Sequence, residues 1–408
     1  MKKTTKRILC SVMSVALAST LVVETALRMY ADETGKTTTV SASFTDVTGE
    51  YDTSALRQEN FNGDVLKGES KPTYETRSVV ISLKGDNLID ASSKEGKSVN
   101  SYLNTWSGEM RANAMRDEQD ALLQKLTETG IPYTLETRYN SVLNGVAITV
   151  NTKHVSTIKK MAGVDSVVIA KTYAEPEAIT TKASASDITN ATSVYKTGIY
   201  DTTKYTDVEN TGDLGEGMVV AVLDTGLDYT HSAFQRVPQN PAWEKEYVKS
   251  LLADLEKELS AEKGGAFDAN DLYVSAKVPF AYDYADKDAD VYPSYSNHGT
   301  HVAGIIGGYD ENGYTDKDGN AITDEAFRGV VPDAQLVICK VFTDDLDDKD
   351  LGGAEATDII SALNDCVLIG VDVINMSLGT SCGFTTTDDG DEEGELLNAV
   401  YDDIKGRH

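Results

Sequence analysis

Continuous apolar runs alternate with helical patterns in the second half of the 408-residue sequence. Three runs, at residues 218–223, 335–342 and 371–378, lack polar alternation and are typical of strands buried on both faces. Residues 298–307 and 356–368 lie between them and have the character of helices. Because parallel strands need crossover connections, this order predicts an α/β domain with a parallel sheet flanked by helices.

Residues 76–172 predict a smaller α/β unit. Apolar residues alternate between positions 79 and 83, as in a strand, and an amphipathic helix follows. Two strands with a tight-turn signal at Asn144-Gly145 come next, then a short helix and a last strand. The order βαββαβ is a small ferredoxin-like pattern, which by itself specifies no function.

The ends and junctions of these units are typical of an exported protein. A basic start and a short apolar core predict a signal peptide at residues 1–31. Polar composition predicts a flexible leader at residues 32–72 and an exposed linker at 173–187. The two folded domains are therefore expected at 73–172 and 188–408, with no membrane span after the signal peptide.

Charge and cysteine content exclude several classes of function. A formal net charge of −29 argues against nucleic acid or an anionic membrane as a partner, because both would repel the chain. The four cysteines include no CxxC pair, so neither a zinc site nor a disulfide framework is predicted.

Asp224 and His298 are the strongest candidates for chemistry. Asp224 ends an apolar strand in VVAVLDTGLD, at the edge where α/β sheets place their sites. His298 opens a glycine-rich helical segment, NHGTHVAGIIGG. Taken singly, the aspartate also fits a turn cap, and His298 with His301 also fits a metal pair, although no HExxH motif is present. Their order along the chain, aspartate before histidine, favours one catalytic site.

Four segments in order resemble the subtilases, the subtilisin-like serine proteases. AVLDTGLD is similar to the aspartate motif of that family, and NHGTHVAGIIGG to its histidine motif. GVVPDAQLVICKVF resembles the strand that follows, and VDVINMSLG the strand whose edge binds substrate. The resemblance covers about residues 188–380, and the helical insertion at residues 243–260 is most similar to the bacterial cell-envelope proteinases of the lactocepin type.

The resemblance implies a secreted or cell-envelope-associated serine endopeptidase that cleaves proteins or peptides without a cofactor. Asp224 would orient His298, which would take the proton of a nucleophilic serine. The segment of Ser377, Leu378 and Gly379 would bind an extended substrate through main-chain hydrogen bonds. SVLNGVAI is similar to the central hairpin of inhibitory pro-segments, so residues 73–172 are expected to be an intramolecular pro-domain.

No serine in this sequence is assigned as the nucleophile. The family places its oxyanion-hole asparagine and its serine later than His408, so the resemblance implies an N-terminal portion that is inactive as given. Gly379-Thr380-Ser381 spells the nucleophile motif, but it directly follows the strand expected to bind substrate. A triad is recognised by geometry and role rather than spelling, so Ser381 is not expected to act.

Two other functions stay open on the residues alone. The chain also fits an inactive, subtilase-like module that binds peptides, or a secreted metal-binding protein with zinc at His298 and His301. No metal site is assigned. Acidic runs at residues 283–290, 316–325 and 344–350 leave room for structural calcium, although solvated surface loops explain them as well.

Overall fold

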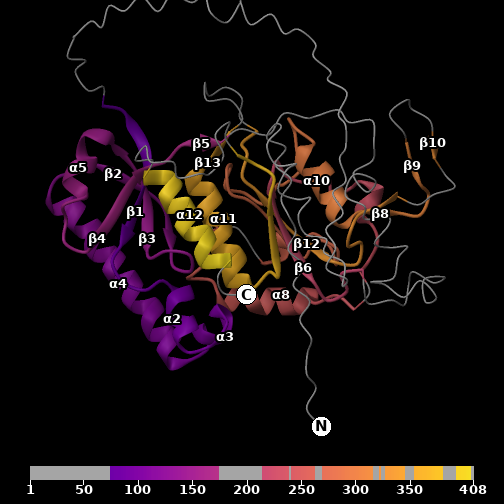
Figure 1. Ribbon diagram of the computed structural model, residues 1–408, viewed down its shortest axis with the longest axis horizontal. Coiled ribbons are helices and arrows are strands. Elements are labelled where there is room, and N and C mark those ends of the chain that lie inside the picture. The colour runs from indigo at the N-terminus through magenta and orange to yellow at the C-terminus, as the bar shows by residue number, and fades with distance from the viewer. Residues whose placement is uncertain are drawn as a thin grey trace, which may run out of the picture. The chain divides into compact units, whose positions relative to one another are not determined.

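The computed structural model of the chain describes most of both predicted folded domains (Figure 1). The described residues are 74–173, 214–238, 240–261, 269–315, 321–322, 327–344, 353–379 and 392–405. The signal peptide, the leader, nearly all of the predicted linker and Ser381 lie outside them. Among the described helices, none combines the length and apolar character needed to cross a membrane. We call residues 74–173 the N-terminal region and residues 214–405 the C-terminal region.

A four-stranded parallel sheet organises the C-terminal region, in the order β14-β6-β12-β7. Its strands are β6 (Val219–Asp224), β7 (Phe280–Asp283), β12 (Gln335–Lys340) and β14 (Val373–Met376). The predicted parallel sheet is therefore confirmed. Strand β7 was not predicted, because four residues are too few to show a periodic pattern.

Helices cover both faces of this sheet. Because successive side chains of a strand point to opposite faces, Ala221 and Val222 of β6 enter different hydrophobic cores. The core around Ala221 includes apolar residues of α11 (Ala356–Ile369), and the core around Val222 includes Ala303 of α10 (His298–Gly307). The two predicted helices are present, and each lies against a different face.

The predicted insertion forms a helix that is shorter than expected. Helix α8 (Lys245–Asp254) buries Val248, Leu251 and Leu252, but it ends well before residue 260. Beyond a turn, the N–H groups of Ser260 and Ala261 donate to a carboxylate on α11 instead of continuing the helix.

The remaining elements of the C-terminal region are short, apart from its last helix. They are η4 (Ser232–Phe234), α9 (Ala269–Leu272), β8 (Tyr309–Asp310), β9 (Tyr314–Thr315), β10 (Ala321–Ile322), β11 (Phe327–Arg328), β13 (Ala354–Glu355) and α12 (Glu392–Lys405).

The N-terminal region contains a second four-stranded sheet, in the order β2-β3-β1-β4 with every neighbouring pair antiparallel. Its elements follow the predicted sequence of strand, helix, strand, strand, helix, strand, with two additional short helices before the long one. They are β1 (Thr76–Leu83), α2 (Leu88–Lys94), α3 (Val99–Leu103), α4 (Trp106–Glu128), β2 (Tyr133–Tyr139), β3 (Gly145–Asn151), η2 (Thr152–His154), α5 (Val155–Ile158), β4 (Val164–Ile169) and β5 (Thr172–Tyr173).

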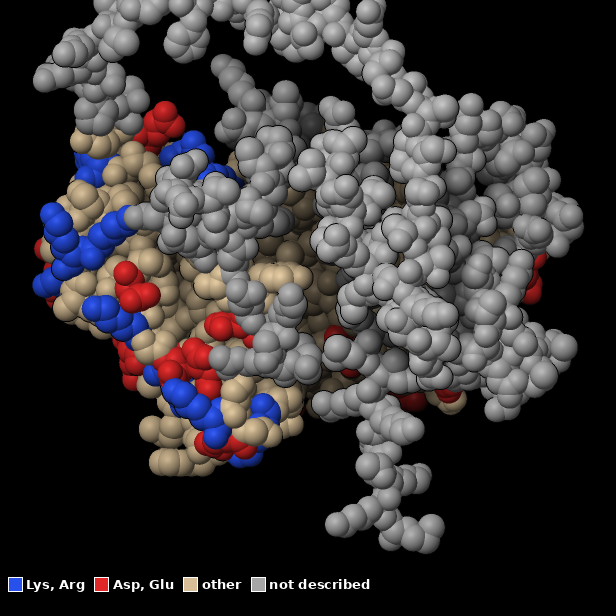
Figure 2. All heavy atoms as spheres, in the orientation of Figure 1, with Lys and Arg blue, Asp and Glu red and all other residues tan. Residues whose placement is uncertain are grey.

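Each face of this second sheet packs against a different partner. On one face, Ile81 and Ile148 pack with Leu126 of α4. On the other face, Val80 and Ala147 belong to the core that also contains α11. On the side shown in Figure 2, acidic and basic side chains are interspersed over the surface of the N-terminal region. Lys94 and Asp86 form an exposed ion pair in this region.

The connection between β2 and β3 differs from the predicted tight turn. It consists of residues 140–144, and Asn140 and Ser141 are buried rather than exposed. Gly145 is needed for close approach, because a Cβ atom there would lie 2.2 Å from the carbonyl oxygen of Ile81. The longer connection is stabilised by contacts with the C-terminal region, which no local pattern reveals.

Candidate active site

Asp224 and His298 are in direct contact. The Nδ1 atom of His298 lies 2.8 Å from Oδ1 of Asp224, which is within hydrogen-bond distance. Asp224 is 1% exposed as the last residue of β6, whereas the His298 side chain is 18% exposed at the first position of α10. A carboxylate only accepts, so this contact requires the proton on Nδ1 of the imidazole. A buried carboxylate therefore holds the imidazole of His298, and part of the His298 side chain is exposed to solvent.

Thr225 joins the aspartate to the segment before the histidine. Its N–H donates to Oδ1 of Asp224 at 2.7 Å, and its hydroxyl donates to the carbonyl oxygen of Ser296 at 3.0 Å. The same hydroxyl accepts from the N–H of Gly299 at 2.9 Å. The second oxygen of Asp224, Oδ2, is buried and has no hydrogen-bond partner among the described residues.

Two glycines allow the strand end and the helix start to approach closely. Gly226 has φ +103°, and a Cβ atom there would lie 2.3 Å from the carbonyl oxygen of Val291. A Cβ atom on Gly299 would lie 2.3 Å from the carbonyl oxygen of Gly226. Close packing therefore requires a glycine at Gly299. It does not require one at Gly304, where the nearest atom would be 3.7 Å from an added Cβ.

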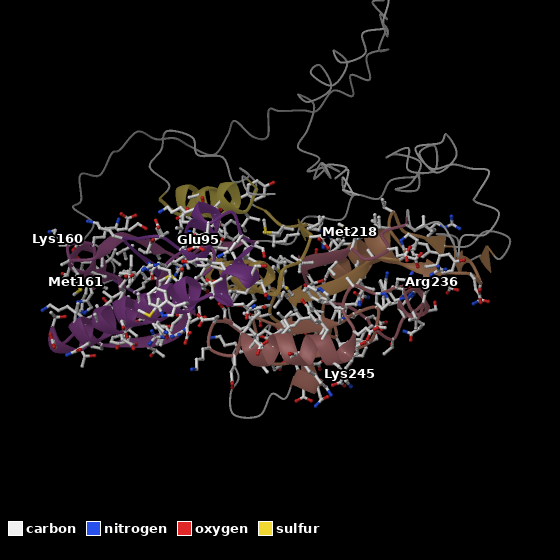
Figure 3. The ribbon with its side chains drawn as sticks, turned by 90° about the horizontal axis from the view of Figure 1, so that it is seen from below. Glu95, Lys160, Met161, Met218, Arg236 and Lys245 are labelled. Carbon is white, nitrogen blue, oxygen red and sulfur yellow. The ribbon has the colours of Figure 1, made fainter. Side chains whose placement is uncertain are left out.

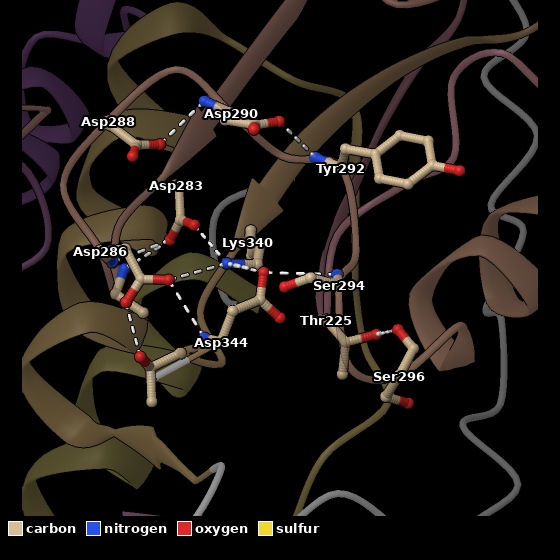
Figure 4. A network of polar contacts seen from close by, with 12 residues as sticks. Thr225, Asp283, Asp286, Asp288, Asp290, Tyr292, Ser294, Ser296, Lys340 and Asp344 are labelled. Carbon is tan, nitrogen blue, oxygen red and sulfur yellow. Dashed lines mark hydrogen bonds and ion pairs between the residues drawn. The ribbon is translucent and has the colours of Figure 1, made fainter. Parts of the chain in front are cut away.

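Lys340, at the end of β12, lies beside Asp224 in the sheet and is 1% exposed. Figure 4 shows Lys340 among Asp283, Asp286 and Asp344. Its ammonium group forms ion pairs with Asp283, with Asp286 at 3.0 Å and with Asp344 at 3.2 Å. Asp344 in turn accepts from the N–H of Ser294. These contacts join the loop that leads to His298 to the strand next to Asp224.

The charge state of Lys340 follows from this arrangement. Burial alone would lower the pKa of the amine, but the carboxylates of Asp283 and Asp286 outweigh burial and raise it above its ordinary value. The ammonium is therefore charged at neutral pH. On its other side, the lysine stem packs against Gly226, whose added Cβ would lie 3.0 Å from Cδ of Lys340.

The acidic side chains at residues 283–290 form ion pairs and hydrogen bonds with groups of the protein itself. Asp283 and Asp286 bind Lys340, while Asp288 accepts from the N–H of Asp290 and Asp290 accepts from that of Tyr292 (Figure 4). Within the described ranges, no three His, Cys, Asp or Glu side chains are grouped to hold a metal ion. The acidic residues 316–320 and 345–350 lie outside those ranges, and structural calcium stays a prediction.

The predicted substrate-binding residues follow the edge strand of the described sheet. Ser377 and Leu378 come directly after β14, and the Ser377 hydroxyl accepts from Nδ2 of Asn375 at 3.0 Å. Leu378 is anchored in the core, whereas a Cβ atom on Gly379 would meet no atom of the described residues within 4 Å. The described residues therefore leave the backbone at Gly379 uncovered, next to a strand that is itself in register with β6.

A two-residue strand of the N-terminal region lies near the carboxyl ends of the parallel strands. Strand β5 (Thr172–Tyr173) pairs antiparallel with β13 (Ala354–Glu355), and Ala354 also forms a bridge with Phe342 just beyond the end of β12. The end of the N-terminal region is therefore bound as an extended segment near the carboxyl ends of the parallel strands.

Lys340 is a functional candidate that sequence reasoning missed. The available signal was a single charged residue at the end of the apolar run QLVICK. A lysine is rarely buried without a partner, so that position required an acidic neighbour. The chain offers many acidic residues, and only the fold shows which ones surround it.

Comparisons with known proteins agree with these motifs. Residues 215–407 match the sequence profile of the Subtilase family, peptidase S8. The PII-type proteinase of Lactococcus lactis subsp. cremoris is 33% identical over 253 residues, which cover 62% of this chain and 11% of that protein. A C5a peptidase of Streptococcus pyogenes is 32% identical over 170 residues, or 41% of this chain and 12% of that protein.

The matched proteins are much longer than this chain, which spans about a tenth of their length. Among solved structures, fervidolysin of Fervidobacterium pennivorans, a keratinolytic enzyme related to subtilisin, aligns with 82% of this chain and 39% of its own. The sequence identity is 14% and the TM-score 0.41. The sequence matches carry the assignment: residues 215–407 belong to the subtilase family and are homologous to the lactococcal PII-type proteinase and the streptococcal C5a peptidase.

Proposed function

We propose that this chain is part of the precursor of a subtilisin-type serine endopeptidase, with Asp224 and His298 as two members of its catalytic triad. The contact of 2.8 Å between these two side chains, inside the region that matches the Subtilase family, carries the proposal. With Nδ1 protonated and bound to Asp224, the other ring nitrogen would act as the base for a serine hydroxyl. Asp224 would then stabilise the imidazolium that forms.

The nucleophile and the oxyanion donor are not assigned to any residue of this chain. In subtilisin-type catalysis the triad acts as a unit, so loss of the nucleophile removes almost all of the rate. We therefore expect that the 408-residue chain by itself does not hydrolyse peptides.

The substrate is proposed to be a protein or peptide in an extended conformation. Ser377, Leu378 and Gly379 would offer main-chain hydrogen bonds beside the catalytic pair. This recognition mode needs a strand edge next to open space, and the surroundings of Gly379 fit that need.

The N-terminal region is proposed to be an inhibitory pro-domain that is removed on maturation. Its support is the pairing of β5 with β13, which holds an extended segment of the chain close to the carboxyl ends of the parallel strands. With a signal peptide at residues 1–31, the enzyme would be secreted or associated with the cell envelope.

A fluorophosphonate probe, which reacts with activated serines, tests the proposed function. The natural gene product, isolated from its host, should be labelled and should hydrolyse casein, and a His298→Ala variant should do neither. The 408-residue chain should remain unlabelled in parallel. Labelling of that chain at Ser381 would contradict the statement that it holds no nucleophile.

An inactive peptide-binding module is the second candidate, because β13 already binds an extended segment without any assigned nucleophile. A natural gene product that binds casein peptides but resists the probe would favour this module. It would overturn the proposed peptidase.

A further inference from the structure

The insertion that contains α8 holds none of the candidate catalytic or substrate-binding residues, and its end contacts the N-terminal region. We call residues 255–261 the insertion end. Its backbone is fixed on α11, where Asp365 accepts from the N–H groups of Ser260 at 2.6 Å and Ala261 at 2.8 Å. The hydroxyl of Tyr284 also donates to Asp365, at 3.0 Å. The insertion end is therefore a rigid part of the C-terminal region.

Glu258 of the insertion end points its carboxylate at the N-terminal region. Oε1 accepts from Arg116 of α4, and Oε2 accepts from Nδ2 of Asn140 at 2.9 Å. The Glu258 side chain is only 9% exposed and that of Arg116 24%. An ion pair this well shielded from water depends strongly on both partners, because either charge alone would be left without compensation.

Asn364 of α11 completes the same surface. Its Oδ1 accepts from the N–H groups of Asn140 at 3.0 Å and Ser141 at 2.9 Å, and its carbonyl oxygen accepts from the Ser141 hydroxyl at 2.8 Å. Nδ2 of Asn364 donates to Ser260, whose hydroxyl donates to the carbonyl oxygen of Arg138. One connected hydrogen-bond network therefore binds the backbone of residues 138–141.

This polar network lies beside an apolar core that the two regions also share, which includes Val80, Ala147 and residues of α11. Asn140, Ser141, Glu258 and Asn364 are all buried and all polar, and each uses its polar atoms on a partner in the other region. Burial of the apolar core is non-directional, whereas hydrogen bonds fix which groups face each other. The network thus supplies the specific recognition at this contact.

We propose that the insertion end, with Asn364, is a docking receptor for the N-terminal region of this same chain, and that Glu258 is its recognition residue. The inference deepens the proposed pro-domain role and rests on it for its consequence, which is the orientation in which the N-terminal region lies against the catalytic domain. Figure 3 labels Lys245 at the start of α8, where its ammonium group lies over the ring of Tyr273. The contact with the N-terminal region lies beyond the other end of this helix.

Hydrogen exchange in the full chain tests the proposal without any need for activity. The N–H groups of Asn140 and Ser141 donate to Asn364, so peptides covering residues 139–144 report separation of the two regions. Residues 145–151 belong to β3, whose N–H groups are bonded inside the N-terminal sheet, so they report its unfolding. Mass spectrometry of peptic fragments follows both at once.

Glu258→Gln should raise exchange in residues 139–144 by at least about tenfold and leave residues 145–151 unchanged, because truncation of a shielded charge pair usually costs more than one tenfold step. Arg116→Gln should act alike, and the double variant should add little. The matched control is Glu246→Gln, which removes the same charge from the same insertion. Glu246 is exposed and forms an ion pair with Lys249 at 3.4 Å.

Three results would overturn the docking receptor. These are unchanged exchange at 139–144 in Glu258→Gln, an equal rise in Glu246→Gln, or a joint rise of 139–144 and 145–151, which would mean that Glu258 supports folding. A natural gene product without peptidase activity would instead remove the pro-domain consequence and leave the docking contact standing.

Discussion

The ammonium nitrogen of Lys340 lies 3.0 Å from a carboxylate oxygen of Asp286, and this ion pair joins the end of β12 to the loop that precedes His298. The same lysine packs against Gly226, next to Asp224. One buried cation thus contacts both of the segments that carry the candidate catalytic pair.

Replacement of this cation should be strongly destabilising. Lys340→Met leaves Asp283 buried without its partner, and we expect the free energy of unfolding to fall by about 3–5 kcal/mol in urea titrations. The matched control is Lys249→Met, which breaks an exposed pair with Glu246 and should cost about 0–1 kcal/mol. Equal losses in the two variants would mean that the Lys340 network contributes no more than a surface pair.

The Asp224–His298 contact should be visible by proton NMR in the 408-residue chain. A histidine N–H that donates to a buried carboxylate is deshielded, so a resonance downfield of the amide region is expected. It should disappear in Asp224→Asn and in His298→Ala. Asp228→Asn, which changes a nearby aspartate bound to Thr230, should leave it in place. Persistence of the resonance in Asp224→Asn would assign it to another group and remove this support for the triad.

The turn after Asp224 should not tolerate a side chain. Gly226→Ala places a Cβ atom 2.3 Å from a backbone oxygen at φ +103°. Gly96→Ala is the matched control, because its φ is +65° and its added Cβ meets nothing within 4 Å. The control should cost about 1–2 kcal/mol of unfolding free energy from backbone strain alone, and Gly226→Ala clearly more. A cost at Gly226 no larger than at Gly96 would show that Val291 moves away freely.

Stability should depend on pH through Lys277. This amine donates to the carbonyl oxygens of Pro332 and Ala334, and burial lowers its pKa from 10.5 to about 7. Between these values the unfolded chain carries a proton that the folded chain has lost, so the contribution of Lys277 to stability rises with pH, by up to about 1.4 kcal/mol per unit.

The measurement compares the wild type with Lys277→Met by urea unfolding at two pH values inside this window. The wild type should gain stability relative to the variant at the higher pH, because methionine has no proton to lose. A difference between the two proteins that does not change with pH would show that the folded amine keeps its ordinary pKa.

Local patterns were sufficient for the long buried strands, for helices α10 and α11 and for the Asp224–His298 pair. Continuous apolar runs predicted the buried strands β6 and β12 because burial on both faces excludes polar residues. The ends of helix α10 matched the prediction because its apolar segment is bounded by Asn297 and Gly308, residue types that are common next to helix ends. The order of Asp224 and His298 along the chain pointed to one site, and parallel strands bring such positions to one edge.

Only the tertiary structure decided which distant polar groups became partners. Nothing near Lys340 in the sequence singled out Asp283 and Asp286 from the many other acidic residues, and no local pattern marked Asn364 as the acceptor for the turn after β2. The physical reason is the distance along the chain over which each effect acts. Propensity and apolar periodicity act over a few residues, whereas a buried charge or amide is satisfied by whichever partner the packed helices and sheets bring within hydrogen-bond distance.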